Sequence, residues 1–517
     1  MNWDAVNHAT PSLIFAYVVT GVPMLIGLLQ QRASFHRILT SPLIAVLVTL
    51  AGVIAWAVIR FFWAHAGALP PAIVVYWTGT IFLACFGYMA GTLMGKRHAK
   101  TAHHRGTVIE EGRTPRAHAD ALCLAGIPVP PLDETKHFKL IGTTGTGKST
   151  AIRELLEGAL ARGDRAVIAD PDGGYLDRFY NARSGDLILN PFDSRASHWD
   201  IFAEIEQPYD VEQLARALIP DQDGADKAWR HYARTFLTAV MRQLWELGAA
   251  DASHRSVGEL YRLVSIAPAE ELRILVGNTS AQPFLESGNE RMFGSIRSVA
   301  SASLAPLEHI AQQRAAPLAV RQWTRVGKGR ALFLPYTASQ ISALRTMISA
   351  WLRLAIFEAM NGGERDQRLW FVVDELDALG QIDGLKDALA RLRKFGGRCV
   401  LGFQSIAQVS STYGQGEAQT IVENCGNTLI LRCSASEGGG TARFASRLIG
   451  EREIVRIHES RSTRPGTWQA SKTHSEQHVT ESAVLPSEIE QLPDLAGYLK
   501  LASSPSWRRV TITRLGT

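Results

Sequence analysis

Residues 137–162 read HFKLIGTTGTGKSTAIRELLEGALAR, a segment that contains a strand, a glycine-rich loop and a helix in that order. The apolar run HFKLI before the loop predicts a buried strand. After the loop, apolar residues recur at the spacing of one face of an amphipathic helix. These residues are Ile152, Leu155, Leu156, Ala159 and Leu160. The pattern predicts an α/β fold in which the helix packs on a sheet.

The loop itself, GTTGTGKS at 142–149, fits the pattern of Gly, four residues, Gly, Lys and then Ser or Thr. Its glycines let backbone N–H groups surround phosphate oxygens, and the following helix directs its positive end at them. We expect Lys148 to reach the β and γ phosphates of ATP and the Ser149 hydroxyl to hold Mg²⁺. A glycine turn that only joins a strand to a helix is the alternative, which the flanking pattern disfavours. The expected nucleotide-binding residues are Gly142, Thr143, Thr144, Gly145, Thr146, Gly147, Lys148, Ser149 and Thr150.

A second motif, LWFVVDEL at 369–376, is an apolar run that ends in two acidic residues. A strand buried on both faces would deliver these carboxylates to its C-terminal end, beside the glycine-rich loop. We expect Asp374 to orient Mg²⁺ and Glu375 to act as the general base on the attacking water. Alone the motif is weak, because apolar strands often end in an acidic turn, but the upstream loop strengthens it.

Basic residues gather toward the end of the helix expected over 384–398. They can be solvated charges that favour the helix dipole, contacts to DNA phosphates, or the source of an arginine for the γ-phosphate bound to a neighbouring subunit. The strand CVLGF then ends at Gln404, whose side chain can sense the γ-phosphate or position water. The basic residues are Lys386, Arg391, Arg393 and Lys394.

The first 95 residues carry almost no charge and contain three apolar segments, at 11–29, 42–59 and 71–94. Each is long enough, or nearly so, to cross a hydrocarbon core of ~30 Å as a helix. Basic residues precede the second segment and follow the third, with only Arg60 between them, so the positive-inside rule predicts a hairpin with cytoplasmic flanks. The first segment contains Gly21 and Pro23. If this segment spans the membrane, the N-terminus lies outside; if it does not, the segment lies along the membrane surface. Neither a cleaved signal peptide nor a set of buried core helices is favoured.

Further apolar runs at 165–171, 186–191 and 331–336 predict more strands of a mostly parallel sheet. DPDGG at 170–174 lies where such a strand ends, and it either shapes the nucleotide site or forms a simple turn. We expect residues 451–480, which are charged and rich in Ser and Thr, to form a mobile loop. The five cysteines show no metal-ligand spacing and predict neither a disulfide framework nor a zinc site.

Between 207 and 313 the apolar residues follow helical periodicity, and aromatic residues such as Trp229, Phe236 and Trp245 are expected on the buried faces of helices. The expected organisation is a transmembrane anchor at 1–95, a cytoplasmic linker at 96–132, the first part of a nucleotide-binding domain at 133–206, an all-α insertion at 207–313, and the second part of the domain at 314–517.

With these motifs in place, the chain resembles the TraD/TrwB-type coupling proteins of conjugative type IV secretion systems, over nearly its whole length. The resemblance rests on the two motifs above together with RGDRAVIADPDGG, LILNPFD, GFQSIAQVSSTYGQGEAQT and LPSEIEQLPDLAGYL. It implies a RecA-like ATPase domain with an inserted all-α domain behind N-terminal transmembrane helices. The catalytic residues that it implies are Lys148, Glu375, Gln404 and Arg393, with ATP and Mg²⁺ as cofactors.

The resemblance also implies a multi-pass protein of the bacterial inner membrane with a cytoplasmic ATPase domain. Its partners would be single-stranded DNA bound without sequence preference, relaxase and relaxosome proteins, and components of the secretion channel, and six copies would form a ring. The family usually shows two membrane spans, so the third apolar segment is a departure.

Three other functions compete with that of a DNA-driven motor. A membrane receptor that recruits relaxase and protein substrates, and uses ATP for assembly, keeps the same fold and is the main alternative. A chromosome-partitioning translocase of the FtsK type lacks room for a DNA-reading domain after the last strand, and an ABC-type subunit would carry an LSGGQ-like signature that is not found here.

Overall fold

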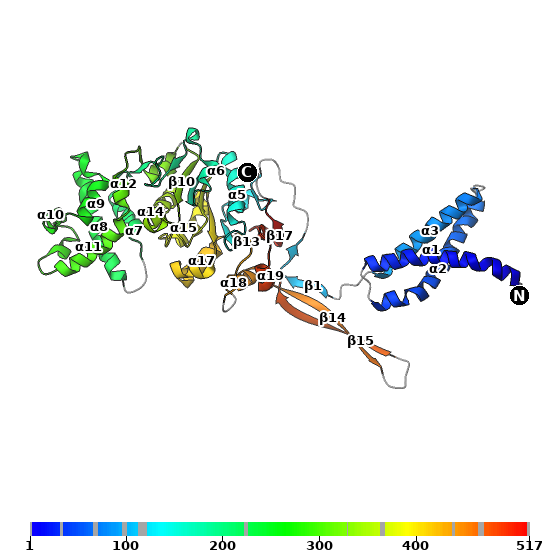
Figure 1. Ribbon diagram of the computed structural model, residues 1–517. Coiled ribbons are helices and arrows are strands. Elements are labelled where there is room, and N and C mark those ends of the chain that lie inside the picture. Colours follow the sequence, from blue (N-terminus) through cyan, green and yellow to red (C-terminus); the bar gives the residue numbers. More distant parts are fainter. Residues whose placement is uncertain are drawn as a thin grey trace. The chain divides into compact units, whose positions relative to one another are not determined.

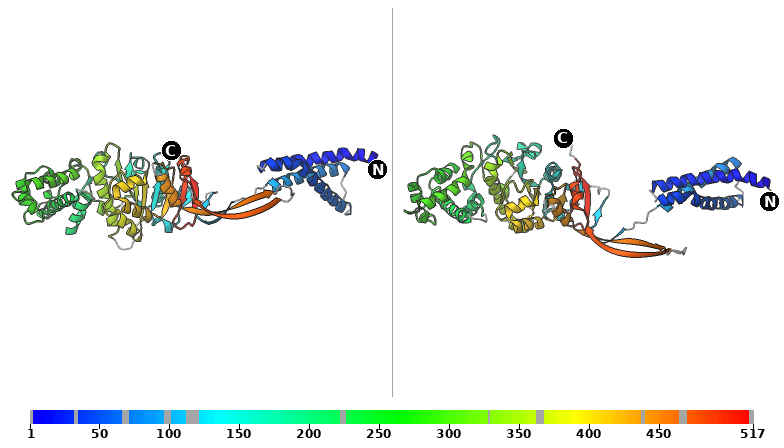
Figure 2. Two further views of the ribbon diagram at one scale, coloured as in Figure 1. Left: turned by 90° about the horizontal axis from the view of Figure 1, so that it is seen from below. Right: turned by 60° about the horizontal axis from the view of Figure 1, so that its bottom comes forward.

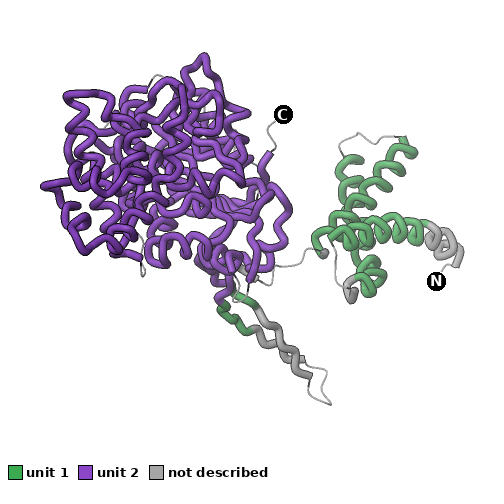
Figure 3. Tube along the Cα trace, turned by 60° about the vertical axis from the view of Figure 1, so that its left-hand side comes forward, with its two compact units in different colours: residues 1–103, 454–479 green, residues 104–453, 480–517 purple. Residues whose placement is uncertain are grey.

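The computed structural model describes residues 3–31, 35–65, 71–95, 101–111, 121–221, 226–327, 329–361, 368–436, 440–463 and 470–513. The chain divides into two compact units (Figure 3). Unit 1 comprises residues 1–103 and 454–479, and unit 2 comprises residues 104–453 and 480–517. Residues 96–100 and 112–120 of the predicted linker lie outside the described residues.

The three apolar segments form three helices, α1 (Trp3–Gln30), α2 (Phe35–His65) and α3 (Ala72–Gly95). Each contains a stretch that is long and apolar enough to cross a membrane. Gly21 and Pro23 do not interrupt α1, which continues through both residues. The described side chains of these helices are largely exposed, as expected for surfaces that face lipid.

Glycines allow α1 and α3 to approach each other closely. A Cβ on Gly87 would lie 2.1 Å from the Thr20 carbonyl oxygen, and one on Gly91 would lie 2.1 Å from the Met24 carbonyl oxygen. Only a residue without a side chain fits at either position, as in other membrane helices that pack through small residues. Because the residue numbers increase together along both helices, α1 runs in the same direction as α3.

Unit 2 is built on a ten-stranded sheet with the order β2-β17-β16-β13-β5-β12-β11-β6-β10-β7 (Figure 1). The run from β13 to β7 is parallel throughout, whereas β16 pairs antiparallel with both β13 and β17. The expectation of an α/β fold with a mostly parallel sheet is therefore confirmed. The strands are β2 (Ile109–Glu110), β5 (Phe138–Ile141), β6 (Arg165–Pro171), β7 (Leu187–Ile188), β10 (Ala331–Tyr336), β11 (Leu369–Val373), β12 (Gly397–Phe403), β13 (Asn427–Ile430), β16 (Ala496–Lys500) and β17 (Trp507–Thr511).

The central strands are buried on both faces, as their continuous apolar sequences predict. Along β11, Leu369, Phe371 and Val373 belong to one core cluster, and Trp370 and Val372 to the other. This alternation follows the period of two of a strand. The helix α5 (Lys148–Ala161) packs in the cluster that contains Trp370, and α14 (Ile341–Ala359) packs in the cluster that contains Phe371.

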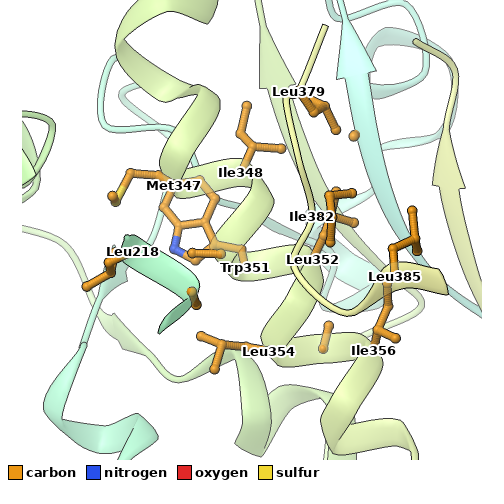
Figure 4. Packing of buried hydrophobic residues seen from close by; sticks show 14 of the residues in the cluster. Leu218, Met347, Ile348, Trp351, Leu352, Leu354, Ile356, Leu379, Ile382 and Leu385 are labelled. Atoms are coloured by element: carbon orange, nitrogen blue, oxygen red, sulfur yellow. The ribbon is translucent and has the colours of Figure 1, made fainter. Parts of the chain in front are cut away.

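Further helices complete unit 2 around the sheet. Figure 4 shows Met347, Trp351 and Leu354 of α14 packing among Leu218, Leu379 and Leu385, which come from before and after it in the sequence. The remaining helices outside the insertion are α4 (Pro131–Glu134), α6 (Leu176–Phe179), α13 (Val320–Val326), α15 (Leu385–Leu392), the 3₁₀ turn η5 (Arg393–Phe395), α16 (Ile406–Tyr413), α17 (Gln415–Asn424), α18 (Gly440–Ile449) and α19 (Pro486–Glu490).

Between β8 (His198–Trp199) and β9 (Pro317–Leu318), which pair with each other, the described residues form helices and no strand. Figures 1 and 2 show these helices grouped at one end of unit 2, away from β16 and β17. Phe236 is fully buried, and Trp229 and Trp245 pack against the same core, so the prediction that these aromatics are core residues is confirmed. The helices are α7 (Pro208–Leu218), α8 (Lys227–Leu247), α9 (Val257–Ser265), α10 (Ala269–Leu275), α11 (Glu290–Leu304) and α12 (Leu307–Ala311).

Two segments differ from the sequence expectations. Residues 451–480 were expected as a mobile loop; 464–469 lie outside the described residues, and the rest belongs to β14 (Glu451–Thr463) and β15 (Ala470–Ser482), which form a three-stranded sheet with β1 (Thr101–Gly106). A polar composition indicates that a segment has no hydrophobic core of its own. The expectation was wrong because strands can pair, and so satisfy their backbone N–H and C=O groups, without such a core.

The second difference lies at residues 121–132, which were expected to belong to a linker. They form the hairpin β3 (Cys123–Leu124) and β4 (Ile127–Pro128), and Leu122, Leu124 and Ile127 are buried in the core beside α5. Ala125 and Gly126 both have positive φ, 52° and 73°, as the tight turn of a two-residue hairpin requires. The Gly and Pro residues therefore mark a packed hairpin rather than a linker.

Candidate nucleotide-binding site

The carboxyl ends of β5, β12, β11 and β6 lie side by side, since these strands are parallel neighbours. Ligands of open α/β sheets bind at this edge. The glycine-rich loop follows β5, the acidic pair Asp374 and Glu375 follows β11, the DPDGG turn follows β6, and Gln404 follows β12. The fold thus brings together at one edge all of the predicted site residues except Arg393.

Two glycines give the loop its shape. Gly145 and Gly147 have φ values of 78° and 116°, a region in which side chains are strained. A Cβ on Gly147 would also lie 2.8 Å from Leu495. Gly147 caps α5, which begins at Lys148, so the N–H groups of its first turn have no acceptor within the helix. This turn can therefore donate hydrogen bonds to phosphate oxygens.

The Lys148 ammonium group lies within the loop. Its Nζ donates to the carbonyl oxygens of Gly142 at 2.7 Å and Thr143 at 3.2 Å, and the residue is buried. Burial lowers the pKa of Lys148, and the charges of Asp374 and Glu375 act against that change. Burial is the larger effect, so the net pKa of Lys148 is lowered although carbonyl oxygens and carboxylates lie near the ammonium group.

The Asp374 carboxylate is held by two hydroxyl groups. Ser149 Oγ donates to Oδ2 at 2.6 Å, and Tyr175 Oη donates to the same oxygen at 2.7 Å. The other oxygen, Oδ1, is buried and accepts no hydrogen bond from the described residues. A buried carboxylate oxygen without a partner beside a serine hydroxyl fits an oxygen-coordinated cation such as Mg²⁺.

The second acid, Glu375, accepts a hydrogen bond of 3.0 Å from Gln404 Nε2. Burial, and next the charge of Asp374, raise the pKa of Glu375, while the hydrogen bond from Gln404 acts in the opposite direction. A carboxylate whose pKa is raised toward the working pH is suited to accept a proton from water. Gln404 is therefore placed to orient this carboxylate.

A cavity of about 610 Å³ connects these groups, which is within the size range of ligand pockets. It is lined by Thr144, Gly145 and residues 147–150 of the loop and by both acids. Gly142, Thr143, Thr146 and Gln404 are not among the lining residues. The Thr146 hydroxyl donates to the Thr143 carbonyl oxygen at 2.7 Å and closes the loop, and Gln404 contacts the lining residue Glu375. The cavity has room for a nucleotide and supplies both cations and carboxylates.

Some cavity residues were missed by the sequence reasoning. Arg153 follows Ser149 by one helical turn, so its position on α5 was the available signal. Tyr175 directly follows the DPDGG turn, where Asp170 accepts hydrogen bonds from the backbone N–H groups of Tyr175 and Leu176. The DPDGG segment therefore both forms a turn and contributes to the nucleotide cavity. The missed lining residues are Arg153, Tyr175, Arg178, Asp494 and Leu495, whereas the lining residues Pro171, Asp172 and Gly174 belong to the DPDGG stretch already considered.

Arg393 lies away from this cavity. It is exposed in η5, just before β12 begins at Gly397, whereas Gln404 follows the other end of the same strand. Its side chain is therefore at the opposite edge of the sheet from Lys148. Within one subunit it does not reach the cavity, and a role there would require a second copy of the chain.

Comparisons with known proteins identify relatives of this chain. Residues 121–513 match the family described as the type IV secretion-system coupling protein DNA-binding domain. The coupling protein TraD of Escherichia coli strain K12 is 30% identical over 385 residues, which are 73% of this chain and 52% of TraD. VirD4 of Bartonella quintana, a type IV secretion system-coupling protein, is 22% identical over 64% of this chain and 51% of its own length. The chain spans about half the length of these curated relatives.

Solved structures of the plasmid coupling protein TrwB share the fold at 32% sequence identity. The complex with ADPNP, a non-hydrolysable ATP analogue, has a TM-score of 0.70 and covers 80% of this chain and 95% of the TrwB chain. The complex with ADP and Mg²⁺ has a TM-score of 0.67 and covers 78% of this chain and 90% of the other. These solved chains thus bind nucleotide on the same fold.

Proposed function

The chain belongs to the type IV secretion-system coupling proteins, and on this premise we propose that it is a membrane ATPase that drives the transfer of single-stranded DNA. It links a DNA–relaxase complex to a type IV secretion channel, with unit 2 in the cytoplasm and α1 to α3 in the inner membrane. The observation that carries the ATPase part is that Lys148, Ser149 and Asp374 line one cavity, where Ser149 donates a 2.6 Å hydrogen bond to Asp374.

ATP binds with its phosphates in the glycine-rich loop. The first turn of α5 donates N–H groups to them, and Lys148 exchanges its contacts with loop carbonyls for contacts with the β and γ phosphates. Ser149 and Asp374 hold Mg²⁺, which offsets the charge of the phosphates. These groups bind and orient the substrate and need no movement of the sheet.

Glu375 accepts the proton of the attacking water, and its raised pKa makes the carboxylate a stronger base for this step. Gln404 keeps the carboxylate in place through their 3.0 Å hydrogen bond. Six copies form a ring with ATP between neighbours, and Arg393 of one subunit reaches the γ-phosphate bound to the next. The exposed position of Arg393 at the opposite edge of the sheet supports this arrangement.

The proposal is tested by the ATPase rate of the full-length protein in detergent, with and without single-stranded DNA. We expect DNA of unrelated sequences to raise the rate severalfold, and added salt to weaken the effect, because the contacts are mainly to phosphates. Glu375→Gln is expected to abolish turnover while keeping nucleotide binding. Glu490→Gln, an exposed carboxylate outside the cavity, is the matched control.

Two results would count against the motor. ATPase activity that persists in Lys148→Ala would contradict the site assignment. Turnover that is present in the wild type but indifferent to DNA would favour the alternative, a membrane receptor that recruits relaxase and protein substrates and uses ATP for assembly.

A further inference from the structure

The two oxygens of the Asp374 carboxylate have different surroundings. Oδ2 accepts hydrogen bonds from the Ser149 and Tyr175 hydroxyl groups, whereas Oδ1 accepts none from the part of the chain that the structure describes. A carboxylate held by two donors on one oxygen cannot turn without breaking both bonds. The other oxygen, which is buried, is therefore held in one direction as well.

Tyr175 itself is held rigidly. Its side chain is almost fully buried, and its backbone N–H donates to both carboxylate oxygens of Asp170 at 3.1 Å. Asp170 follows Ala169 on β6, and Ala169 is paired with Val373 on β11, so both aspartates leave neighbouring strands at the same edge. The Tyr175 hydroxyl is thus carried by the sheet rather than by a free loop.

The ring of Tyr175 is also covered from the side of α5. The guanidinium carbon of Arg153 lies 5.6 Å from the ring centroid, at the distance of a cation–π contact. A Cβ on Gly174 would lie 2.6 Å from Arg153 Nη2, so the glycine before Tyr175 leaves space for this arginine. Arg153 and Asp170 together restrict Tyr175 to one orientation.

We propose that Tyr175 is a positioning residue that orients the Asp374 carboxylate toward the Mg²⁺ bound with the nucleotide. The inference rests on the proposed nucleotide-hydrolysing function. Ser149 would also be a ligand of the metal, whereas the Tyr175 hydroxyl would remain a donor to Asp374. Tyr175 is thus the donor that keeps Asp374 oriented when the metal enters. Partners of this kind typically affect metal affinity or activity by about 10- to 100-fold.

The test compares full-length wild type with Tyr175→Phe, which removes only the hydroxyl. The affinity for Mn²⁺, a spectroscopic substitute for Mg²⁺, is measured by electron paramagnetic resonance in the presence of ADP. We expect Tyr175→Phe to weaken Mn²⁺ binding by about 10- to 100-fold, and ADP binding in EDTA to stay unchanged. Tyr180→Phe is the matched control, because Tyr180 lies outside the cavity and its ring contacts Phe333.

Unchanged Mn²⁺ affinity in Tyr175→Phe overturns the inference. A loss of Mn²⁺ affinity accompanied by an equal loss of ADP affinity in EDTA also overturns it, because the hydroxyl then supports the whole site rather than the metal. Hydrolysis is recorded separately: a wild type that binds Mn²⁺ and ADP but hydrolyses no ATP contradicts the proposed function, while the Mn²⁺ measurement still decides the role of Tyr175.

Discussion

The Ser149 hydroxyl donates a 2.6 Å hydrogen bond to Asp374, although the two residues are 225 positions apart in the sequence. This contact joins the first residues of α5 to the end of β11, and so joins the phosphate-binding loop to the acidic pair. It exists because β5 and β11 lie on either side of β12 in one parallel sheet, with their carboxyl ends at the same edge.

Ser149→Ala is expected to weaken the response to Mg²⁺, because it removes both the proposed metal ligand and a donor to Asp374. The Mg²⁺ concentration for half-maximal ATPase activity should rise about tenfold or more. Ser149→Thr keeps the hydroxyl and is the control, with a response close to wild type. Equal Mg²⁺ dependence in Ser149→Ala and wild type would show that the hydroxyl is not a ligand.

Gln404→Ala is expected to slow turnover about 10- to 100-fold, as loss of an orienting partner does, and to leave nucleotide affinity unchanged. Because the hydrogen bond from Gln404 lowers the pKa of Glu375, its loss raises that pKa further. The acid limb of the pH–rate profile should therefore move to higher pH. Gln419→Ala, on an exposed residue that bonds Glu423, is the control. An acid limb that stays at the wild-type pH in Gln404→Ala would show that Gln404 does not influence the pKa of Glu375.

The parts of this site that were predictable from sequence are those with a local pattern. The glycine loop, the apolar run before Asp374 and Glu375, and the periodicity of α5 each occupy one short segment, and neighbouring residues decide their structure. The partnership of Gln404 with Glu375 was not predicted as a contact. Both residues were found because each lies within two residues of the end of a buried strand.

Tyr175 and Leu495 were missed for the opposite reason. Each joins the cavity through tertiary packing, which no spacing in the sequence reports; the Leu495 backbone N–H, for example, donates to the Thr146 carbonyl oxygen at 2.9 Å across the fold. The hairpin at β3 and β4 was taken for a linker since Gly and Pro residues mark turns of packed hairpins and of linkers alike. Such signals identify a turn but not what packs against it.

Arg393→Ala is expected to abolish turnover, and mixing it with Lys148→Ala should restore part of the activity. A Lys148→Ala subunit still presents Arg393, and an Arg393→Ala subunit still has a complete nucleotide cavity, so an interface between the two is intact on one side. The measurement is the ATPase rate of co-assembled variants against each alone. Lys394→Ala, the exposed neighbour in η5, is the control. Activity of Arg393→Ala equal to wild type would remove Arg393 from the mechanism.

His137 is expected to make the stability of unit 2 sensitive to acid. Its Nδ1 accepts the Cys399 N–H at 3.1 Å, and Nε2 therefore donates to the Leu389 carbonyl oxygen at 2.9 Å, an arrangement that only the neutral ring allows. Burial lowers the pKa of His137 from 6.5 to about 4. The unfolded chain thus takes up a proton between these values and the folded chain does not, so this stabilisation is complete above pH 6.5 and is lost as the pH falls toward 4.

Between pH 6.5 and pH 5 the loss is about 2 kcal/mol, at 1.36 kcal/mol for each pKa unit. The measurement is the free energy of unfolding of unit 2 by denaturant at pH 7.5 and pH 5, for wild type and His137→Asn; Asn tolerates the positive φ of 55° at this position. The wild type should lose about 2 kcal/mol more than the variant over this range. Equal losses would show that His137 is not the responsible group.

The N-terminus is expected on the outer side of the membrane. Since α1 runs parallel to α3 through the contacts of Gly87 with Thr20 and of Gly91 with Met24, both helices must end on the same side. The basic residues that follow α3 in the sequence put that side in the cytoplasm. An N-terminal epitope tag should therefore be cleaved by protease added to spheroplasts. Protection of the tag until the cells are lysed would show that α1 does not cross the membrane.

The same contacts predict which substitutions release α1. Gly87→Leu and Gly91→Leu place a side chain where a Cβ already lies 2.1 Å from a backbone oxygen of α1, so the two helices must separate. The variants should become sensitive to protease within α1 and lose thermal stability in detergent. Met89→Leu, on an exposed residue of the same helix, should behave as wild type. If the glycine variants resist protease as well as Met89→Leu does, the close packing of α1 on α3 is not what holds α1 in the anchor. The position of the N-terminus then rests on the tag experiment alone.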